Sequence, residues 1–566
     1  MSEKEKPVMC PMVAWYDPRQ LARTAVDVAI STIFGRHSDY RITEALVAPS
    51  EGDNVWEDDP TDVPADADGV YDYSNREQIW IDYIADTGDG WDATYTVAYY
   101  ATQPELELRD AGAALPRGDL LVFGGDQVYP VANRKSYRER LFEPYEAALP
   151  KTDPPHPDVF AVPGNHDWYD SLVSFMRLFC SRRWFGGWRT RQSRSYFVLK
   201  LPHRWWLVGT DVQLDSDIDI PQLKYFKRIA RKMGDGDRII LCTAEPHWIF
   251  AKIYNKYDEE INENNLAFLD KKIFTKQQIA VYMAGDLHHY RRHATESGLQ
   301  KITAGGGGAF LHPTHGEDVK ELADGYRLAD TGTYPPVSES KKLTWKNLGF
   351  LILNPWFGIA TALLYTLTCW SVMANLGRFG LRQWYQAMKV AIAVSIANPT
   401  AVFWILLVWG GFLLFTDTYS KWYRAIAGTL HGLAHVLAVF FIGWFATYVG
   451  VRWFHWPFKS PQQLLLAGGM IFVLGWIVGS IVMGIYLLIS LNFFGRHSNE
   501  AFSALAIPDW KHFLRLRVDS QGLTIFPIGI RRVARKWQKS EGAGPLFVPA
   551  DSSATPPQLI ELPVRV

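Results

Sequence analysis

The sequence predicts a layered α/β domain followed by a group of membrane-spanning helices. Apolar strands alternate with helices between residues 80 and about 315, and long apolar runs begin near residue 349. The alternation is typical of a sheet covered by helices, whereas runs of about 20 apolar residues are long enough to cross a bilayer. A chain of 566 residues is also too long for one ordinary domain.

The overall composition narrows the class of function. The formal net charge is −1, so no nucleic-acid partner is indicated. The four cysteines are scattered and lack the spacing of zinc ligands. Neither a zinc site built from cysteines nor a disulfide framework is therefore predicted. The 23 tryptophans suit a membrane protein with aromatic side chains at the bilayer surface.

Residues 1–79 are predicted to form an N-terminal extension. The chain begins with charged residues and no apolar signal core follows, so we expect the α/β domain in the cytosol. Residues 18–34 have apolar positions at helical spacing, with Arg19, Arg23 and Asp27 on the polar face. This helix either docks on the following domain or lies on the membrane surface.

The region 345–492 is predicted to cross the cell membrane several times. Its four apolar runs are residues 349–373, 400–416, 429–451 and 463–490. Residues 381–398 between the first two runs are amphipathic and favour an interfacial position. Four spans place residues 493–566, predicted as a small β segment and tail, on the same side as the α/β domain. The basic residues that flank the spans are too evenly divided to orient the protein.

Polar side chains follow several predicted strands and suggest a metal site. Each group of residues follows the end of a predicted strand, and glycines accompany four of the five turns. The groups are Asp86; Gly125-Asp126; Gly164-Asn165-His166-Asp167; His247; and Gly285-Asp286-Leu287-His288. Oxygen donors mixed with imidazole suit Mn, Fe or Zn. Two such metals about 4 Å apart can bind a phosphate ester, generate a hydroxide and stabilise the leaving oxygen.

These motifs, in this order, resemble the calcineurin-like metallophosphoesterase superfamily. The resemblance covers residues 80–320 and implies an α/β/β/α sandwich with a dinuclear metal centre. Asp86-Thr87-Gly88 and Gly125-Asp126-Gln127-Val128-Tyr129 are similar to the purple acid phosphatase version. In that version a glycine replaces the usual histidine of the first motif, and a tyrosine binds the first metal.

The resemblance implies a ligand set for two metal ions, which could be Mn, Fe or Zn. The first ion would be held by Asp86, Asp126, Tyr129 and His288. The second would be held by Asp126, Asn165, His247 and Asp286. The family has histidine at position 286, so the aspartate here either binds a harder metal such as Mn or leaves the site weakened. His166, oriented by Asp167, would assist the leaving group or bind the phosphate.

Several roles stay open at the level of sequence. Tyr129 either binds metal or packs in the core, and Asp89 either orients a ligand or replaces one. Residues Gly305 to Gly308 either cradle a phosphate or let the chain turn closely beside the metals. His289 either faces the pocket or pairs nearby, and His312 and His315 either line the pocket or lie at the surface, which is favoured. His431 and His435 in the third apolar run either mark a polar pathway or lie at the membrane interface.

The sequence therefore predicts a membrane-anchored phosphoesterase that hydrolyses a phosphate mono- or diester with two metals. The substrate would be a phosphorylated small molecule or a lipid; the oligomeric state is not predicted. The aspartate at position 286 supports an alternative, a degenerate phosphoesterase-like regulatory or binding module of a membrane assembly. A transporter has little support, because the spans hold few ionisable residues beyond His431 and His435.

Overall fold

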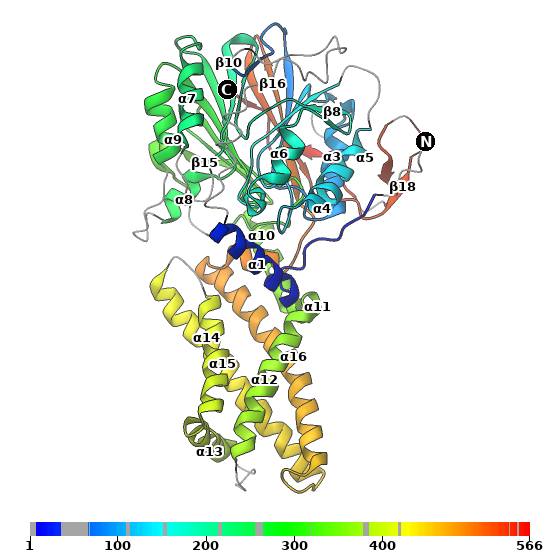
Figure 1. The fold of residues 1–566 in the computed structure, drawn as a ribbon, viewed down its shortest axis with the longest axis vertical. Coiled ribbons are helices and arrows are strands. Elements are labelled where there is room, and N and C mark those ends of the chain that lie inside the picture. Colours follow the sequence, from blue (N-terminus) through cyan, green and yellow to red (C-terminus); the bar gives the residue numbers. More distant parts are fainter. Residues whose placement is uncertain are drawn as a thin grey trace.

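A mixed α/β domain stands on a bundle of long helices, and helix α1 (Pro18–Phe34) lies at their junction (Figure 1). The computed structural model describes residues 7–34, 66, 68–108, 114–150, 156–212, 218–254, 264–316, 319–376, 384–416, 420–540, 542, 544–551 and 554–566. Within α1 it describes side chains only as far as residue 26.

The first sheet has eight strands in the order β1-β9-β10-β11-β12-β14-β13-β15. Their bounds are Val70–Asp72, Phe197–Lys200, Trp205–Gly209, Arg238–Cys242, Gln278–Ala284, Gln300–Ala304, Tyr290–Ala294 and Arg327–Tyr334. The central strands β10, β11, β12 and β14 are parallel, so their carboxyl ends lie at one edge of the sheet.

The second sheet follows the order β20-β17-β16-β2-β5-β6-β8-β7, and β21 also pairs with β17. Their bounds are Gln558–Leu559, Gly522–Ile530, Lys511–Asp519, Ile79–Ile84, Leu120–Phe123, Asp158–Ala161, Trp188–Thr190, Trp184–Phe185 and, for β21, Val564–Arg565. Strands β2, β5 and β6 are parallel, and β16 pairs with β2 antiparallel. The C-terminal strands, which the sequence placed in a separate small segment, therefore extend the sheet of the α/β domain.

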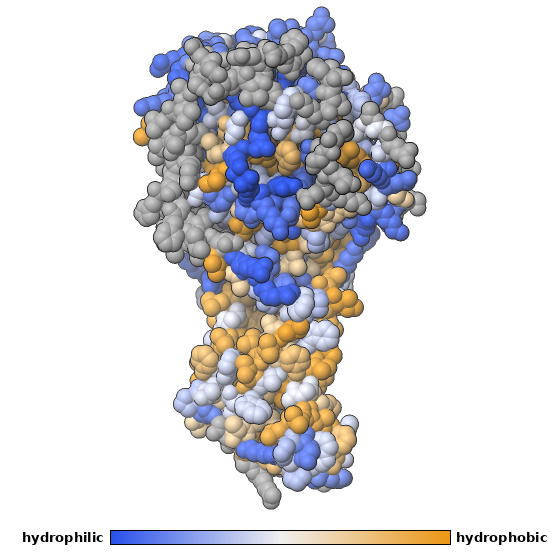
Figure 2. All heavy atoms as spheres, turned by 45° about the vertical axis from the view of Figure 1, so that its right-hand side comes forward, coloured by the Kyte–Doolittle hydropathy of each residue, from blue (hydrophilic) through white to orange (hydrophobic). Residues whose placement is uncertain are grey.

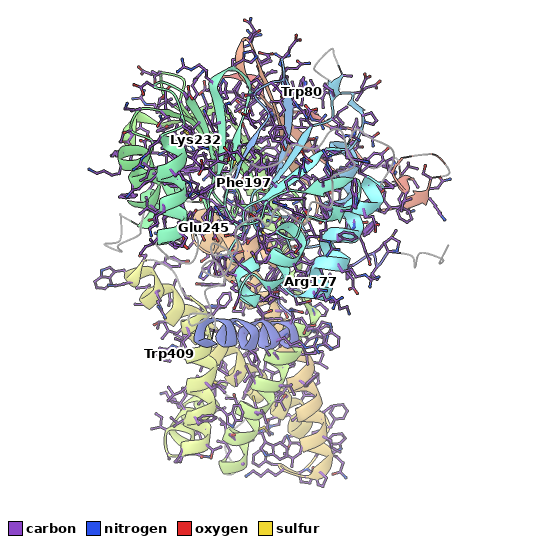
Figure 3. The ribbon with its side chains drawn as sticks, turned by 45° about the horizontal axis from the view of Figure 1, so that its top comes forward. Trp80, Arg177, Phe197, Lys232, Glu245 and Trp409 are labelled. Atoms are coloured by element: carbon purple, nitrogen blue, oxygen red, sulfur yellow. The ribbon has the colours of Figure 1, made fainter. Side chains whose placement is uncertain are left out.

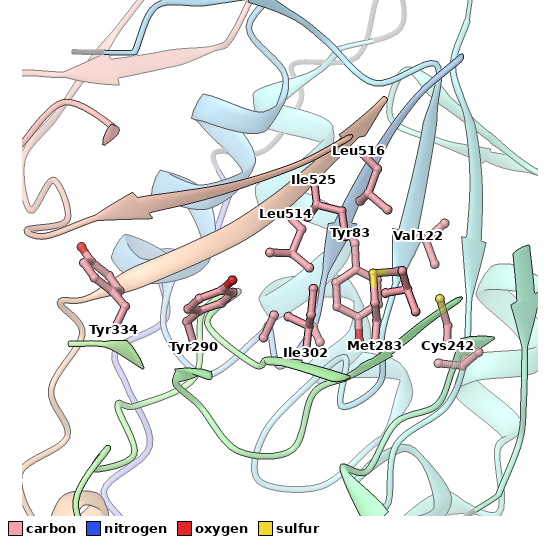
Figure 4. Packing of buried hydrophobic residues seen from close by; sticks show 14 of the residues in the cluster. Tyr83, Val122, Cys242, Met283, Tyr290, Ile302, Tyr334, Leu514, Leu516 and Ile525 are labelled. Carbon is pink, nitrogen blue, oxygen red and sulfur yellow. The ribbon is translucent and has the colours of Figure 1, made fainter. Parts of the chain in front are cut away.

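The core lies between the two sheets (Figure 4). Tyr83 and Leu514 from the second sheet pack with Met283 and Ile302 from the first, and all four are fully buried. Full burial of each such side chain contributes about 1.5–3 kcal/mol. Helices α3 (Trp91–Ala101) and α5 (Glu143–Ala148) pack on the outer face of the second sheet, and α7 (Ile220–Ala230) packs on that of the first. The predicted α/β/β/α sandwich is confirmed.

A buried ion pair links strand β16 to its neighbour β2 in the second sheet. Arg515 of β16 donates to both carboxylate oxygens of Asp82 in β2, at 2.7 and 3.0 Å. Its guanidinium also donates to the main-chain oxygens of Leu115 and Ala101. Because a buried ion that loses its partner costs about 3–5 kcal/mol, this pair makes β16 part of the folded domain.

Below the domain, the described residues contain three helices that are long and apolar enough to cross a membrane: α12 (Pro355–Asn375), α15 (Lys421–Tyr448) with its continuation to Trp453, and α16 (Pro461–Phe494). Helices α13 (Trp384–Ile396) and α14 (Pro399–Phe415) qualify only as a pair, and they are bent by 105° at their junction. On the face shown in Figure 2, apolar side chains cover much of the bundle beneath the more hydrophilic domain. This agrees with the predicted membrane region.

The sheet pairing constrains the number of crossings. Strand β15, before the bundle, and strand β16, after it, both pair with strands of the α/β domain, so an even number of chain passes through the bundle must separate them. The three long helices do not satisfy this condition, and within the bent pair the candidate for the fourth pass is α14. With 17 residues it spans about 25 Å, which is slightly less than the hydrocarbon core of about 30 Å.

The two histidines of α15 lie inside the bundle. His435 Nδ1 lies 2.6 Å from the Tyr365 hydroxyl of α12, and its Nε2 lies 3.3 Å from Nε2 of His431. Both side chains are buried, and the ring of Phe412 from α14 stacks on His435. Both histidines are therefore enclosed by helices of the bundle, while the interfacial depth expected from the sequence stays a prediction.

Candidate metal centre

Three aspartates that follow strands share an unusual backbone conformation. Asp86, Asp126 and Asp286 have φ angles of 58°, 49° and 65°. This left-handed region is uncommon for residues with a side chain, although aspartate tolerates it better than most. The turns are also tied together, because the main-chain N–H of Asp286 donates to both carboxylate oxygens of Asp86 at 3.1 and 2.9 Å. Such strain clusters at functional sites.

Glycines allow these turns to approach one another closely. A Cβ atom at Gly164 would collide with the carboxylate of Asp126, and a Cβ at Gly285 or Gly305 would collide with that of Asp86. Gly305 opens the four-glycine run, so this contact supports close packing beside the carboxylates rather than a phosphate cradle.

The structure brings together the four residues predicted for the first metal. The Tyr129 hydroxyl lies 2.9 Å from Asp86 Oδ1, 3.1 Å from Asp126 Oδ2 and 2.9 Å from His288 Nε2. His288 Nδ1 must carry a proton, because it lies 2.7 Å from the carbonyl oxygen of Phe310, which can only accept. His288 Nε2 therefore presents a lone pair to the cluster.

The residues predicted for the second metal surround the shared Asp126. In the part of the chain that the structure describes, the buried atoms Asn165 Oδ1 and His247 Nε2 have no hydrogen-bond partner. Their turns meet that of Asp126, because a Cβ at Gly125 would touch both Ala244 and Gly164. Unpaired buried donors and acceptors are costly, so both atoms suit a ligand that neutralises them.

Negative charge is concentrated at this edge of the sheets. Burial, and then the neighbouring charges of Asp126 and Asp286, raise the pKa of Asp86 well above its usual value. Burial and Asp126 raise the pKa of Asp286 to about 7. Burial lowers the pKa of His247 to about 4 and also lowers that of His288, so both imidazoles are neutral at pH 7.

The donor set fits bound cations. The Tyr129 hydroxyl has one proton for three acceptors, so at least two close contacts lack a hydrogen unless a carboxylate is protonated. A cation would relieve this crowding, and carboxylate, amide and imidazole donors suit Mn, Fe or Zn. Across the described residues, no three His, Cys, Asp or Glu side chains are already arranged as a metal site; the Tyr129 hydroxyl occupies the space between Asp86, Asp126 and His288.

The predicted orientation of His166 by Asp167 is wrong. His166 Nδ1 donates to the carbonyl oxygen of Pro130 at 2.7 Å, which leaves Nε2 free. The Asp167 carboxylate is fully buried and accepts from the Tyr137 hydroxyl at 2.6 Å and from the Gly164 N–H at 2.8 Å. Asp167 therefore holds the turn that carries Asn165 and His166, because the local main chain offers it more hydrogen bonds than the imidazole would.

Asp89 binds main chain rather than replacing a ligand. Its carboxylate accepts from the N–H groups of Val13 at 2.8 Å and Phe310 at 3.0 Å, and Phe310 is the residue that orients His288. Behind this site lies Lys511 of β16, which is fully buried and donates to the carbonyl oxygen of Ala309. Burial lowers the pKa of Lys511 to about 8. No local pattern points to Lys511, which lies 202 positions from Ala309 in the sequence.

The histidines His289, His312 and His315, whose roles stayed open in the sequence, are all buried. His312 stacks on His288 with ring centroids 3.9 Å apart. His315 is hydrogen-bonded between Ser340 and Asn492, at the top of the bundle. The surface position that the sequence favoured for His312 and His315 is wrong, and His289 is buried next to His288.

Residues 79–290 match the sequence profile of the calcineurin-like phosphoesterase family, so the chain contains a calcineurin-like phosphoesterase domain. This confirms the family resemblance. No curated protein matches the whole chain significantly.

Three solved structures align with part of the chain at low sequence identity. GAP50, the anchor in the inner membrane complex of Plasmodium, is 13% identical over 44% of this chain and 77% of that chain, with a TM-score of 0.30. The purple acid phosphatase PPD1 from yellow lupin seeds (Lupinus luteus) is 13% identical over 42% of this chain and 46% of its own, with a TM-score of 0.30. PhoD is 11% identical over 42% of this chain and 58% of its own, with a TM-score of 0.26.

Proposed function

We propose that the chain is a membrane-anchored, metal-dependent phosphoesterase that hydrolyses a phosphate mono- or diester. The observation that carries this proposal is the crowding of Asp86, Asp126 and His288 around one tyrosine hydroxyl. A bound cation would relieve the crowding of acceptors in this buried site. The family profile over residues 79–290 supports the same reaction class.

Asp86, Asp126, Tyr129 and His288 would hold the first metal, and Asp126, Asn165, His247 and Asp286 the second. When bound, the two metals would lower the pKa of a water molecule and offset the charge of the phosphate. The protein's own contribution is positional, because the three aspartates sit on tied turns and His288 is fixed by Phe310 and His312.

His166 would act on the substrate directly. Its Nδ1–H is engaged by Pro130, so only Nε2 can contact a ligand, and the side chain is partly exposed at the site. A protonated Nε2 could donate to a phosphate oxygen or give its proton to the leaving oxygen. Asp167 would contribute through the turn that positions His166.

The test uses the full chain in detergent or nanodiscs, because β16 and β17 complete the second sheet and a fragment ending near residue 345 lacks them. We expect metal-dependent hydrolysis of aryl phosphates. Asn165→Ala and His166→Ala should each lower the rate by at least about a hundredfold, as for loss of one stabilising group in a site.

His203→Ala is the matched control, because His203 is exposed and bonds only the carbonyl oxygen of Glu77. Full activity in both Asn165→Ala and His166→Ala would show that the site is wrongly assigned. A folded protein that binds no metal and hydrolyses neither mono- nor diester would support the regulatory module instead.

A further inference from the structure

A short N-terminal segment joins the metal centre to the bundle. The indole of Trp15 lies edge-on to Tyr129 and His166, with ring centroids 6.3 and 6.2 Å apart. The next residue, Tyr16, packs against Phe350 and Phe357 of the bundle at 5.0 and 5.8 Å. Two consecutive residues therefore contact different parts of the molecule: Trp15 contacts predicted site residues, and Tyr16 contacts the top of the membrane helices.

Helix α1 continues this segment along the junction (Figure 3). It contacts α12 and also the one-turn helix η3 (Asp167–Asp170), which begins directly after His166. The guanidinium of Arg19 lies 4.1 Å above the ring of Trp356, near the start of α12. The rim of the metal centre therefore lies beside α1, on the side of the domain that faces the membrane.

The apolar side of α1 has no protein partner among the described residues. Gln20 and Thr24 are half-buried and hydrogen-bonded to each other at 3.1 Å, whereas Leu21 and Val26 are 47% and 57% exposed. Ala22 and Ala25, which lie between them on the helix, are also exposed. A helix with its apolar side outward at the top of a membrane bundle is typical of an interfacial helix.

The neighbouring surface of the bundle has the same character. Trp345, which begins the one-turn helix η8 (Trp345–Gly349), and Trp356, the second residue of α12, are 56% and 47% exposed. Tryptophan collects at the level of lipid headgroups. The bilayer surface therefore lies at α1, and the occupant of its apolar side is lipid.

We propose that the substrate is an amphiphile with a phosphate ester headgroup, which enters the site from the bilayer across α1. This inference rests on the proposed function. The tail stays among the lipids while the headgroup passes the rim formed by α1 and η3. In the reaction, water forms a new P–O bond, the ester P–O bond breaks, and the leaving oxygen takes up a proton.

The test compares a bilayer substrate with a soluble one. The full chain, loaded with Mn²⁺, is reconstituted in phosphatidylcholine vesicles that contain phosphatidic acid or phosphatidylglycerol as the mono- or diester. The same preparations are assayed on p-nitrophenyl phosphate and its bis ester. We expect hydrolysis of at least one lipid. The double variant Leu21→Glu/Val26→Glu should slow it by about tenfold or more, because charge on the apolar side weakens interfacial contact.

In that double variant the soluble esters should be hydrolysed at the wild-type rate. Ile220→Glu is the matched control: Ile220 is 66% exposed on α7, away from the bundle, and neither rate should change. Hydrolysis of soluble esters without either lipid would overturn the lipid inference and leave the proposed function intact. An equal loss on lipid and soluble esters in the double variant would also overturn it, since α1 would then act structurally. Failure on all four substrates would overturn the proposed function, and the inference with it.

Discussion

The two predicted halves of the metal centre differ in how their donor atoms are partnered. In the first half, one tyrosine hydroxyl contacts Asp86, Asp126 and His288 within 3.1 Å. In the second half, Asn165 Oδ1 and His247 Nε2 have no partner among the described residues. Both halves share Asp126 and draw their residues from the turns after strands of the two sheets, so the difference comes from the side chains and not from the fold.

The geometry of the first half is therefore held by the protein itself, whereas the geometry of the second half depends on a ligand. The first half keeps its arrangement through hydrogen bonds to Tyr129 and Phe310. The second half leaves buried polar atoms unsatisfied, at a cost of about 1–3 kcal/mol each, which a cation would recover. We therefore expect changes in the second half to affect one cation and changes at the shared aspartate to affect both.

Asp126→Asn should have the largest effect, because it removes the charge that both halves share. We expect loss of both cations and a fall in phosphoesterase activity on the order of a thousandfold, the upper range for one electrostatic group of a site. Elemental analysis of the purified full chain measures the metals. Asp235→Asn, at a carboxylate 77% exposed, is the control. Two cations retained in Asp126→Asn would contradict the shared role.

His247→Ala and Tyr129→Phe should separate the halves. His247→Ala should release one of two cations and lower activity by about tenfold to a hundredfold, as for loss of a metal-binding partner. Tyr129→Phe keeps the ring against Trp15 and removes only the hydroxyl, so we expect weaker binding of the other cation alone. Competition with a chelator measures both affinities. The same cation weakened in both variants would mean that the centre has no separate halves.

Metal affinity should also depend on pH. Asp286 has a pKa of about 7, raised by burial and by Asp126, so it gains a proton as the pH falls through 7. The proton competes with the cation, and affinity of the second half should fall by about tenfold per pH unit below 7. Chelator competition between pH 5.5 and 8 checks this. Asp286→Asn should bind more weakly but with a flatter profile; an unchanged slope would assign the titration to another group.

Local patterns predicted the sandwich well, because each strand and its turn lie within a few residues of one another. The strands that end before Asp86, Asp126 and Asp286 are present as expected, and their glycines make the close approach possible. The roles of these residues as metal ligands stay predictions.

Contacts between distant parts of the chain could not be predicted from the sequence. Arg515 pairs with Asp82 across 433 positions, and no local pattern links them. Trp15 reaches the site from an extension that had no assigned role. Asp167 was misread for a related reason: its partner, Tyr137, comes from another element 30 residues away, and sequence adjacency to His166 suggested a pair that the fold does not make.

Asp286→His should have the smallest effect and tests the point where this chain departs from its family. The change replaces a charged oxygen donor with a neutral, softer imidazole, so the second half should prefer Zn over Mn by a further few-fold. Activity of the full chain reconstituted with each metal gives this ratio, and Asp235→His at the exposed position is the control. If the ratio of Zn to Mn activity equals that of the unchanged protein, Asp286 does not bind metal. The second half would then rest on Asn165, His247 and the shared Asp126. Three donors leave a cation with more open positions, and binding there would be weaker than in the first half for that reason alone.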